Sequence, residues 1–202
     1  LPSGKMKSRE GTVVDADDIM EDMYQSAKNI AKELGKIDNI SENEAKDLYE
    51  TVGMGALKYF MLKVDPKKRM LFDPKESIDF NGHTAPFIQY TYARIQSILR
   101  KNTNDIKIIE DIEITDKERE LIKLLLGFPK LIQDSANSFS PALVANYIYD
   151  LVKEYNSYYQ LTSVLGAESD TLISFRVALS KKTSEIIKTG MSLLGIQVPE
   201  RM

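Results

Sequence analysis

Residues 80–101 decide the fold, and they run FNGHTAPFIQYTYARIQSILRK. Thr84 can cap the start of a helix with its side chain, and Pro86 stands in the first turn, where a missing N–H costs nothing. Four apolar residues then recur at helical spacing along one face, namely Ile88, Tyr92, Ile95 and Leu99. Gln89 and Arg94 place polar groups inside this apolar helix, so we expect each of them to bond to a partner.

The same helical spacing recurs along most of the chain and predicts an all-α fold, in which a helical bundle follows a short helical segment. We expect the other helices to run from 15 to 34, from 41 to the Asp65-Pro66 pair, from 115 to 136, from 140 to 158, and from 169 to 195. Two of the starts have the spacing of capping boxes, Ser41 with Glu44 and Thr115 with Glu118.

Some residues interrupt this pattern. Gly53 and Gly55 lie inside a predicted helix, where we expect another element to pack closely. Gly127 and Pro129 are expected to break or kink the helix that begins at Thr115. Residues 70–72 are expected to be extended, because they lie next to the Asp73-Pro74 pair.

Composition excludes several classes of site. The 27 Lys and Arg residues against 30 Asp and Glu give a net charge of -3, so any RNA contact requires a local basic or aromatic surface. The chain has no cysteine and one histidine, His83, so we predict no metal site and expect His83 to make a structural hydrogen bond. No apolar run approaches the roughly 18 residues of a membrane span. We expect a cytoplasmic protein that contacts no membrane.

Three further stretches carry candidate chemistry. The loop at residues 4–11 runs GKMKSREG, and its lysines suit either a solvated basic loop or the phosphates of a nucleotide. The predicted helix at 140–158 and its end carry five tyrosines within thirteen residues, which suit interhelical packing or base stacking: Tyr147, Tyr149, Tyr155, Tyr158 and Tyr159. The end of the chain, residues 190–202, runs GMSLLGIQVPERM and suits a docked tail.

Together these stretches resemble class I arginyl-tRNA synthetases. The resemblance rests on three motifs: a glycine followed by Thr-Ala-Pro and Gln-Tyr-x-x-Ala-Arg-Ile in residues 82–95, the loop similar to the KMSKS signature, and the ending Leu-Leu-Gly-Ile-x-x-Pro-Glu-Arg-Met. Lys5 and Met6 match the first two signature positions. Lys7, Ser8 and Arg9 depart from the remaining three, so the residue that replaces the second signature lysine is open.

The resemblance implies roles for individual residues. Lys5 and Met6 would contact ATP. The tRNA-binding residues would include an aromatic pair with its neighbour, a basic residue of the Asp-Ala-Leu-Arg-type helix, and the chain end, namely Tyr155, Asn156, Tyr159, Arg176 and Met202. For Arg176 an internal salt bridge is an equal alternative. Gln89 and Arg94 would either hold two parts of the chain in register or touch the inner elbow of the tRNA.

The resemblance also implies an organisation. Residues 1–78 would be the end of a catalytic body with the signature loop and stem-contact helices, and residues 79–202 a helical anticodon-binding (DALR) domain. Because residue 1 is a leucine inside a loop-like stretch, we expect a longer parent protein, a ligase that joins arginine to its tRNA with ATP and magnesium. This chain alone lacks the upstream HIGH-type motif, so we expect it to be an inactive monomer without bound cofactor that binds arginine tRNA weakly.

The sequence leaves open one alternative from another class of protein, a binding module in place of a ligase. A freestanding helical module that binds tRNA or a protein without ligase activity would show the same helices. The gene upstream of Leu1 distinguishes them, since several hundred codons with a HIGH-like motif favour the ligase.

Overall fold

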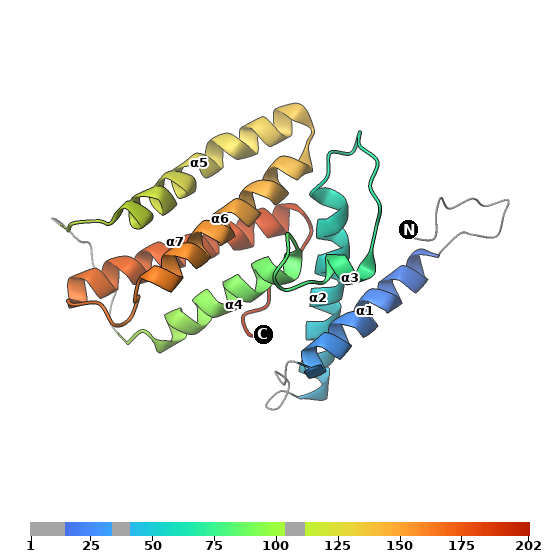
Figure 1. Ribbon diagram of the computed structural model, residues 1–202, viewed down its shortest axis with the longest axis horizontal. Coiled ribbons are helices and arrows are strands. Elements are labelled where there is room, and N and C mark those ends of the chain that lie inside the picture. The colour runs from blue at the N-terminus through green and yellow to red at the C-terminus, as the bar shows by residue number, and fades with distance from the viewer. Residues whose placement is uncertain (1–14, 34–40, 104–111) are drawn as a thin grey trace.

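The computed structural model describes residues 15–33, 41–103 and 112–202. Within these ranges every regular element is an α-helix, so the predicted all-α class is confirmed (Figure 1). The helices are α1 (Ala16–Glu33), α2 (Glu42–Leu62), α3 (Pro74–Ser77), α4 (Ala85–Lys101), α5 (Asp116–Ser138), α6 (Pro141–Leu161) and α7 (Asp170–Leu193).

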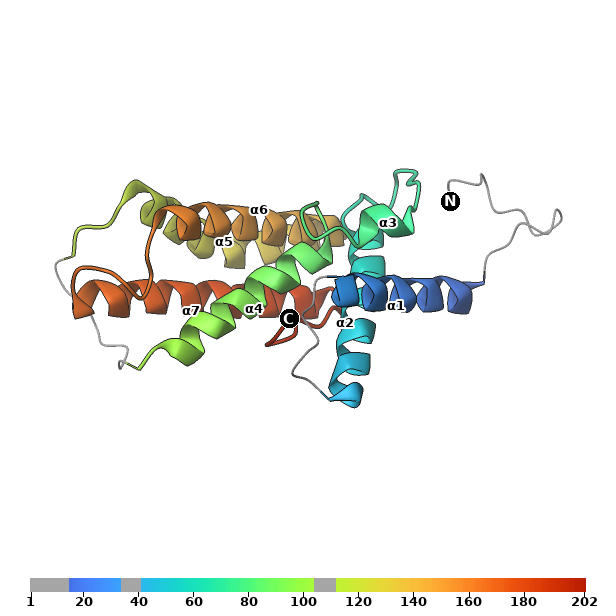
Figure 2. The same ribbon diagram turned by 60° about the horizontal axis from the view of Figure 1, so that its bottom comes forward.

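Helices α4, α5, α6 and α7 lie roughly lengthwise and form an elongated bundle (Figures 1 and 2). Its core is built from the apolar faces that the helical spacing predicts. Several of the largest core side chains are fully buried, including Ile88, Ile95, Leu121, Ile148 and Ile187. Burying each such side chain contributes about 1.5–3 kcal/mol. The bundle holds the larger of the two apolar cores of the molecule.

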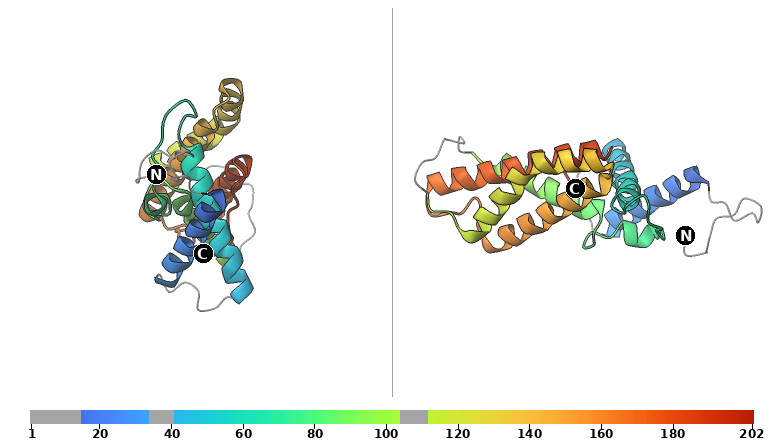
Figure 3. Two further views of the ribbon diagram at one scale, coloured as in Figure 1. Left: turned by 90° about the vertical axis from the view of Figure 1, so that its right-hand side faces the viewer. Right: turned by 90° about the horizontal axis from the view of Figure 1, so that it is seen from above.

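Helix α2 stands across one end of this bundle, and α1 packs on its far side (Figure 3). A second, smaller core forms there, with Met23 of α1 against Val52 and Phe60 of α2. The Phe60 ring meets the Phe72 ring edge-on at 5.3 Å between centroids. Tyr59, also on α2, instead belongs to the bundle core. Helix α2 therefore contributes to both cores.

Small residues let α2 approach its neighbours, as the sequence predicts. A Cβ added at Gly53 would lie 2.8 Å from the Met23 carbonyl oxygen of α1. A Cβ added at Gly55 would lie 2.6 Å from Nε2 of Gln89 on α4. Both distances are shorter than van der Waals contact, so each glycine permits a close helix crossing.

The predicted helix starts are confirmed by their caps. Ser41 and Glu44 exchange hydrogen bonds at the start of α2, as Thr115 and Glu118 do at the start of α5. The Thr84 hydroxyl accepts a hydrogen bond from the Phe87 N–H. These bonds satisfy N–H groups that the first turn of a helix leaves unpaired.

Of the break or kink expected at Gly127 and Pro129, the break is wrong. One helix, α5, runs from 116 to 138 with Pro129 inside it. Pro129 is exposed, and a Cβ at Gly127 would meet no atom within 4 Å, so both residues lie on the outer side of the helix. Packing of α5 against α6, with Leu121 and Leu125 in the core, outweighs the one lost backbone hydrogen bond.

The segment before α4 is partly as expected. Residues 70–73 have no regular structure, in line with the extended segment that was expected at 70–72. The four-residue helix α3 was not predicted, because so short a helix has no apolar periodicity to detect. Asp73 caps it by accepting a hydrogen bond from the Lys75 N–H at 2.9 Å.

In the described part of the chain, no helix has the length and apolar character needed to cross a bilayer.

Candidate nucleic-acid interface

Two hollows open on the surface between α4 and α6, and Arg94 lines both of them. One, of about 520 Å³, is lined by residues that include Phe87, Tyr90, Lys153 and Asn156. The other, of about 480 Å³, is lined by residues that include Lys101, Tyr159 and the connection 162–165. Among the described residues no acidic side chain lines either hollow. The surface is therefore locally basic and aromatic in a chain of negative net charge.

The Arg94 side chain is held in place by neutral groups. Its Nη1 donates a hydrogen bond to Oδ1 of Asn156 at 2.7 Å. Its guanidinium carbon lies 4.9 Å from the centroid of the Tyr90 ring and 5.3 Å from that of Tyr159. A cation between two aromatic rings is attracted to both, with about 0.5–1 kcal/mol for each exposed contact. The arrangement fixes the guanidinium before any ligand arrives.

Asn156 is itself fixed from the α4 side. Its Nδ2 donates to the Thr91 hydroxyl at 2.9 Å, and that hydroxyl donates to the Phe87 carbonyl at 3.0 Å. Because Nδ2 has this acceptor, the amide oxygen faces Arg94. The sequence predicted that Arg94 bonds to a partner, and this prediction is confirmed.

Tyr155 and Tyr159 occupy different positions, although they are neighbours on α6. Tyr159 is 37% exposed, whereas Tyr155 is 0% exposed and its hydroxyl donates to Ser180 Oγ at 3.0 Å. Burial raises the pKa of Tyr155. The two rings stack at 6.4 Å with 18° between their planes. A fully buried ring has no face open to a base, so we correct the expectation for Tyr155: it supports Tyr159 from the core.

Tyr90 was missed by the sequence analysis. It lies four residues before Arg94, which places the two on the same face of α4. The spacing of four residues could have identified Tyr90 as a neighbour of Arg94. The helical pattern selected Tyr92 instead, because Tyr92 lies on the apolar face of α4.

Gln89 is buried where α4 meets α2 and the tail, and does not lie at the surface. It is 0% exposed, and its Nε2 donates to the carbonyls of Thr51 on α2, at 3.1 Å, and Gln197 in the tail, at 2.8 Å. Of the two roles expected for Gln89, the structure supports the register between parts of the chain. A direct contact with tRNA would require this buried amide to become accessible.

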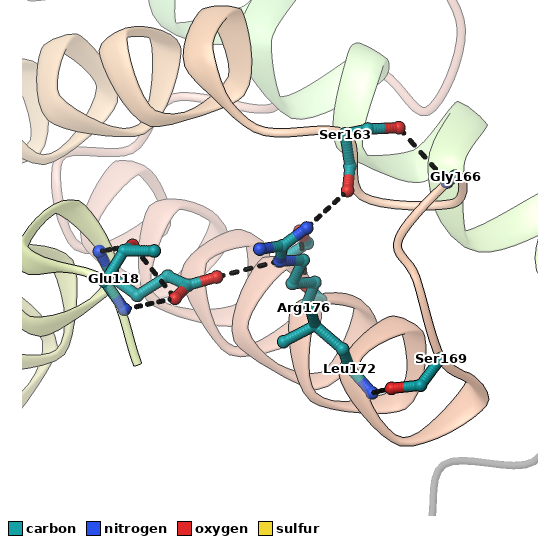
Figure 4. Close-up of polar contacts among 8 residues, drawn as sticks. Glu118, Ser163, Gly166, Ser169, Leu172 and Arg176 are labelled. Atoms are coloured by element: carbon teal, nitrogen blue, oxygen red, sulfur yellow. Dashed lines mark hydrogen bonds and ion pairs between the residues drawn. The ribbon is translucent and has the colours of Figure 1, made fainter. Parts of the chain in front are cut away.

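Arg176 forms the internal salt bridge that was one of its two expected roles. Its Nε lies 2.8 Å from Oε1 of Glu118, and the two side chains are 13% and 0% exposed (Figure 4). Burial alone would raise the pKa of Glu118, but hydrogen bonds from Thr115 and Arg176 outweigh burial and lower this pKa below its ordinary value. Glu118 is therefore ionised in the folded chain at neutral pH.

The tail docks as predicted. Lys58 Nζ donates to the Gly195 carbonyl at 2.8 Å, and Arg100 Nη1 donates to the Glu200 carbonyl at 3.1 Å. Met202 is half-buried and packs against the smaller core. Met202 therefore lies on the smaller core and lines neither of the two hollows.

The remaining aromatic candidates pack between helices. Tyr158 is 0% exposed, and the Tyr147 hydroxyl donates to the Leu124 carbonyl, with burial raising the pKa of Tyr147 to about 12. His83 stacks on Tyr149 at 3.8 Å between centroids. Burial, with Lys63 nearby, lowers the pKa of His83, and its Nε2 has no hydrogen-bond partner within the described ranges. The structural hydrogen bond expected for His83 is made by its backbone, whose carbonyl accepts from Lys63 Nζ at 2.9 Å, while stacking on Tyr149 holds the ring.

The expected ATP contacts Lys5 and Met6 lie outside the described residues. Within the described residues no group of three or more His, Cys, Asp or Glu side chains could hold a metal ion.

Comparisons with known proteins agree with the resemblance. The sequence pattern of the family described as "DALR anticodon binding domain" matches residues 88–202, more than half of the chain. The arginine–tRNA ligase of Flavobacterium psychrophilum is 61% identical over the whole of this chain, which covers 34% of that protein. That of Bacteroides thetaiotaomicron is 54% identical, with 35% of its length covered.

A solved structure shows the same arrangement. Arginyl-tRNA synthetase from Thermus thermophilus superposes with a TM-score of 0.89 at 31% identity, over 98% of this chain and 34% of that one. This chain thus spans about a third of the length of the relatives it matches. With a family pattern that matches residues 88–202, nearly all of its bundle, and a shared helical fold, the chain belongs to the family of the DALR anticodon-binding domain.

Proposed function

We propose that this chain is the tRNA-binding part of an arginine–tRNA ligase, which attaches arginine to its tRNA with ATP. One observation carries the proposal: Arg94 lies between Tyr90 and Tyr159, held by Asn156, where two hollows without acidic residues meet. The family match to an anticodon-binding domain and the arginine–tRNA ligases among the relatives support it.

The chemistry of this surface suits an unpaired stretch of RNA. Bases in a loop expose flat faces, which stack on aromatic rings and on guanidinium planes. Tyr159 is 37% exposed, so part of its ring is open to a base, and Arg94 offers charge without a carboxylate beside it among the described residues. Lys101 and Lys153 lie at the two hollows, where each can neutralise a phosphate. With so few cations, binding is weak and depends on salt.

The other expectations remain parts of this proposal. Lys5 and Met6 would contact ATP, with magnesium, in the whole ligase, and this chain by itself would not aminoacylate. Met202, which lines neither hollow, would contact the tRNA at a second place outside this surface. The protein would act as a monomer in the cytoplasm, where tRNA is charged, with residues 79–202 as the anticodon-binding domain.

The proposal is tested by Tyr159→Ala in a titration with an anticodon stem-loop of arginine tRNA. Losing one stacking contact of about 1–3 kcal/mol predicts binding weakened by roughly five-fold or more. Phe139→Ala is the matched control, because Phe139 is 89% exposed and lies at the turn between α5 and α6, outside both hollows. Equal affinities for the two variants would refute the proposed surface.

A further inference from the structure

Arg176, outside the proposed surface, joins three separate segments of the chain (Figure 4). From α7 its Nε donates to Glu118 Oε1 on α5 at 2.8 Å. Its Nη1 donates to the carbonyl of Ser163, in the connection between α6 and α7, at 2.9 Å. The same guanidinium thus reaches a buried carboxylate and the backbone of an exposed connection.

That connection forms one wall of the hollow beside Arg94 and Tyr159. Residues 162–165 line the hollow directly after Tyr159 and the end of α6. Val164 anchors the connection by burying its side chain in the bundle core, where it is 4% exposed. Ser163 Oγ accepts a hydrogen bond from the Gly166 N–H at 3.1 Å, which tightens the turn. Ser163 therefore has contacts on both its side chain and its backbone.

Glu118 fixes the direction of the guanidinium. Its second oxygen, Oε2, accepts hydrogen bonds from the Thr115 N–H at 2.7 Å and from the Thr115 hydroxyl at 2.9 Å. The carboxylate is thus held by the start of α5 and cannot rotate freely. A planar guanidinium paired with a fixed carboxylate keeps its remaining N–H groups in defined directions, and one of them points at Ser163.

We propose that Arg176 is a positioning residue for the RNA surface: oriented by Glu118, it holds the Ser163 carbonyl and so sets the wall of the hollow beside Tyr159. The inference rests on the proposed binding of RNA at that surface. It differs from a direct RNA contact, because Nε and Nη1 are committed to protein acceptors and the side chain is 13% exposed.

Arg176→Lys tests this role, because lysine keeps the positive charge but has no planar fork to span two acceptors. We expect the anticodon stem-loop of arginine tRNA to bind roughly five-fold more weakly, the effect of about one hydrogen bond. Amide hydrogen exchange should become faster at Gly166 and in residues 162–165, and change little elsewhere. A phosphate contact made directly by Arg176 would instead be largely kept by lysine.

A second variant perturbs the same wall without touching the buried ion pair. A Cβ at Gly166 would lie 2.7 Å from Ser163 Oγ, so Gly166→Ala pushes the Ser163 hydroxyl away and breaks its hydrogen bond with the residue 166 N–H, which loosens the turn from its other side. We expect the same weakening of RNA binding with an unchanged melting temperature. Lys117→Ala is the control, since it removes the Lys117–Glu154 ion pair between α5 and α6 and leaves the connection intact.

Three outcomes overturn the inference. The first is weaker binding by Arg176→Lys with unchanged exchange in residues 162–166, which indicates direct contact. The second is faster exchange there with unchanged affinity for both variants. The third is exchange that rises equally through α5, α6 and α7, which indicates a general loss of stability. The proposed function fails separately, when Tyr159→Ala itself binds RNA like the unaltered chain.

Discussion

Two arginines meet the neighbouring helices of this bundle in opposite ways. Arg94 is half-buried, and its contacts within the described residues are neutral: the Asn156 amide and the Tyr90 and Tyr159 rings. Arg176 is 13% exposed and is paired with a carboxylate that is 0% exposed. A cation among neutral groups keeps its charge available to an anionic ligand, whereas a cation beside a buried carboxylate does not. The environment of Arg94 suits recognition of an anionic ligand, and the environment of Arg176 suits holding the neighbouring segments of the fold in place.

The largest expected effect is on folding. Glu118→Ala leaves the Arg176 charge buried without its partner, and the loss of one member of such a pair costs about 3–5 kcal/mol. Urea unfolding should show this decrease in the free energy of unfolding. Glu154→Ala, which removes the more exposed Lys117–Glu154 pair, should cost less than about 1 kcal/mol. Similar losses for the two variants would break the comparison.

Arg94→Ala should reverse the pattern. We expect it to weaken binding of the anticodon stem-loop by about ten-fold, because a charge and two ring contacts are lost from the surface. Its free energy of unfolding should fall by about 1–2 kcal/mol, the worth of the two ring contacts and less than the loss expected for Glu118→Ala, since the remaining Asn156 amide can reach water. Arg119→Ala removes the same charge from an exposed position on α5, outside both hollows, and should bind normally. A melting temperature that falls while the affinity for RNA is unchanged would mean that Arg94 only holds two parts of the chain in register.

Acid should affect the Arg176 region. The pKa of Glu118 is lowered in the folded chain, so its ionisation stabilises the fold fully above the ordinary glutamate value of 4.5. This contribution is lost as pH falls from there through the lowered pKa. The difference in unfolding free energy between the unaltered chain and Glu118→Gln should therefore shrink below pH 4.5. A difference that stays constant down to pH 2 would contradict the ionised pair.

The smallest effect should come from Lys153, which is exposed at the edge of the larger hollow. Lys153→Ala should weaken RNA binding only about two-fold at moderate salt. The slope of log affinity against log salt should fall by about 0.7, the value for one phosphate of a single strand. Lys188→Ala, an exposed lysine on α7 outside both hollows, should leave the slope unchanged.

Much of the fold was predictable because its signals are local. The capping boxes at Ser41 and Thr115 and the apolar face of α4 depend on residues three or four apart, and the structure contains them as predicted. At Pro129 the prediction of a break was wrong, because the cost of a proline depends on where it lies in the helix. On the outer side of α5 the lost hydrogen bond is outweighed by packing that the local sequence does not show.

The site was only partly predictable, because its partners are distant in sequence. Gln89 and Arg94 both stood out as polar residues in an apolar helix. Their roles differ because Gln89 meets the Thr51 and Gln197 carbonyls, whereas Arg94 meets Asn156, 62 residues later. Tyr155 and Tyr159 share a helix face by spacing, yet only the packing of α7 shows that one is buried. A local pattern selects candidates, and long-range packing assigns them.

The most direct test of the proposed surface compares the two arginines in one experiment. The side-chain N–H signals of Arg94 and Arg176 are followed by NMR while an anticodon stem-loop of arginine tRNA is added. We expect large shifts for Arg94 and for the Asn156 amide, with smaller shifts for Arg176, whose N–H groups stay on Glu118 and Ser163. Large shifts at Arg176 with none at Arg94 and Asn156 would contradict the proposed RNA surface.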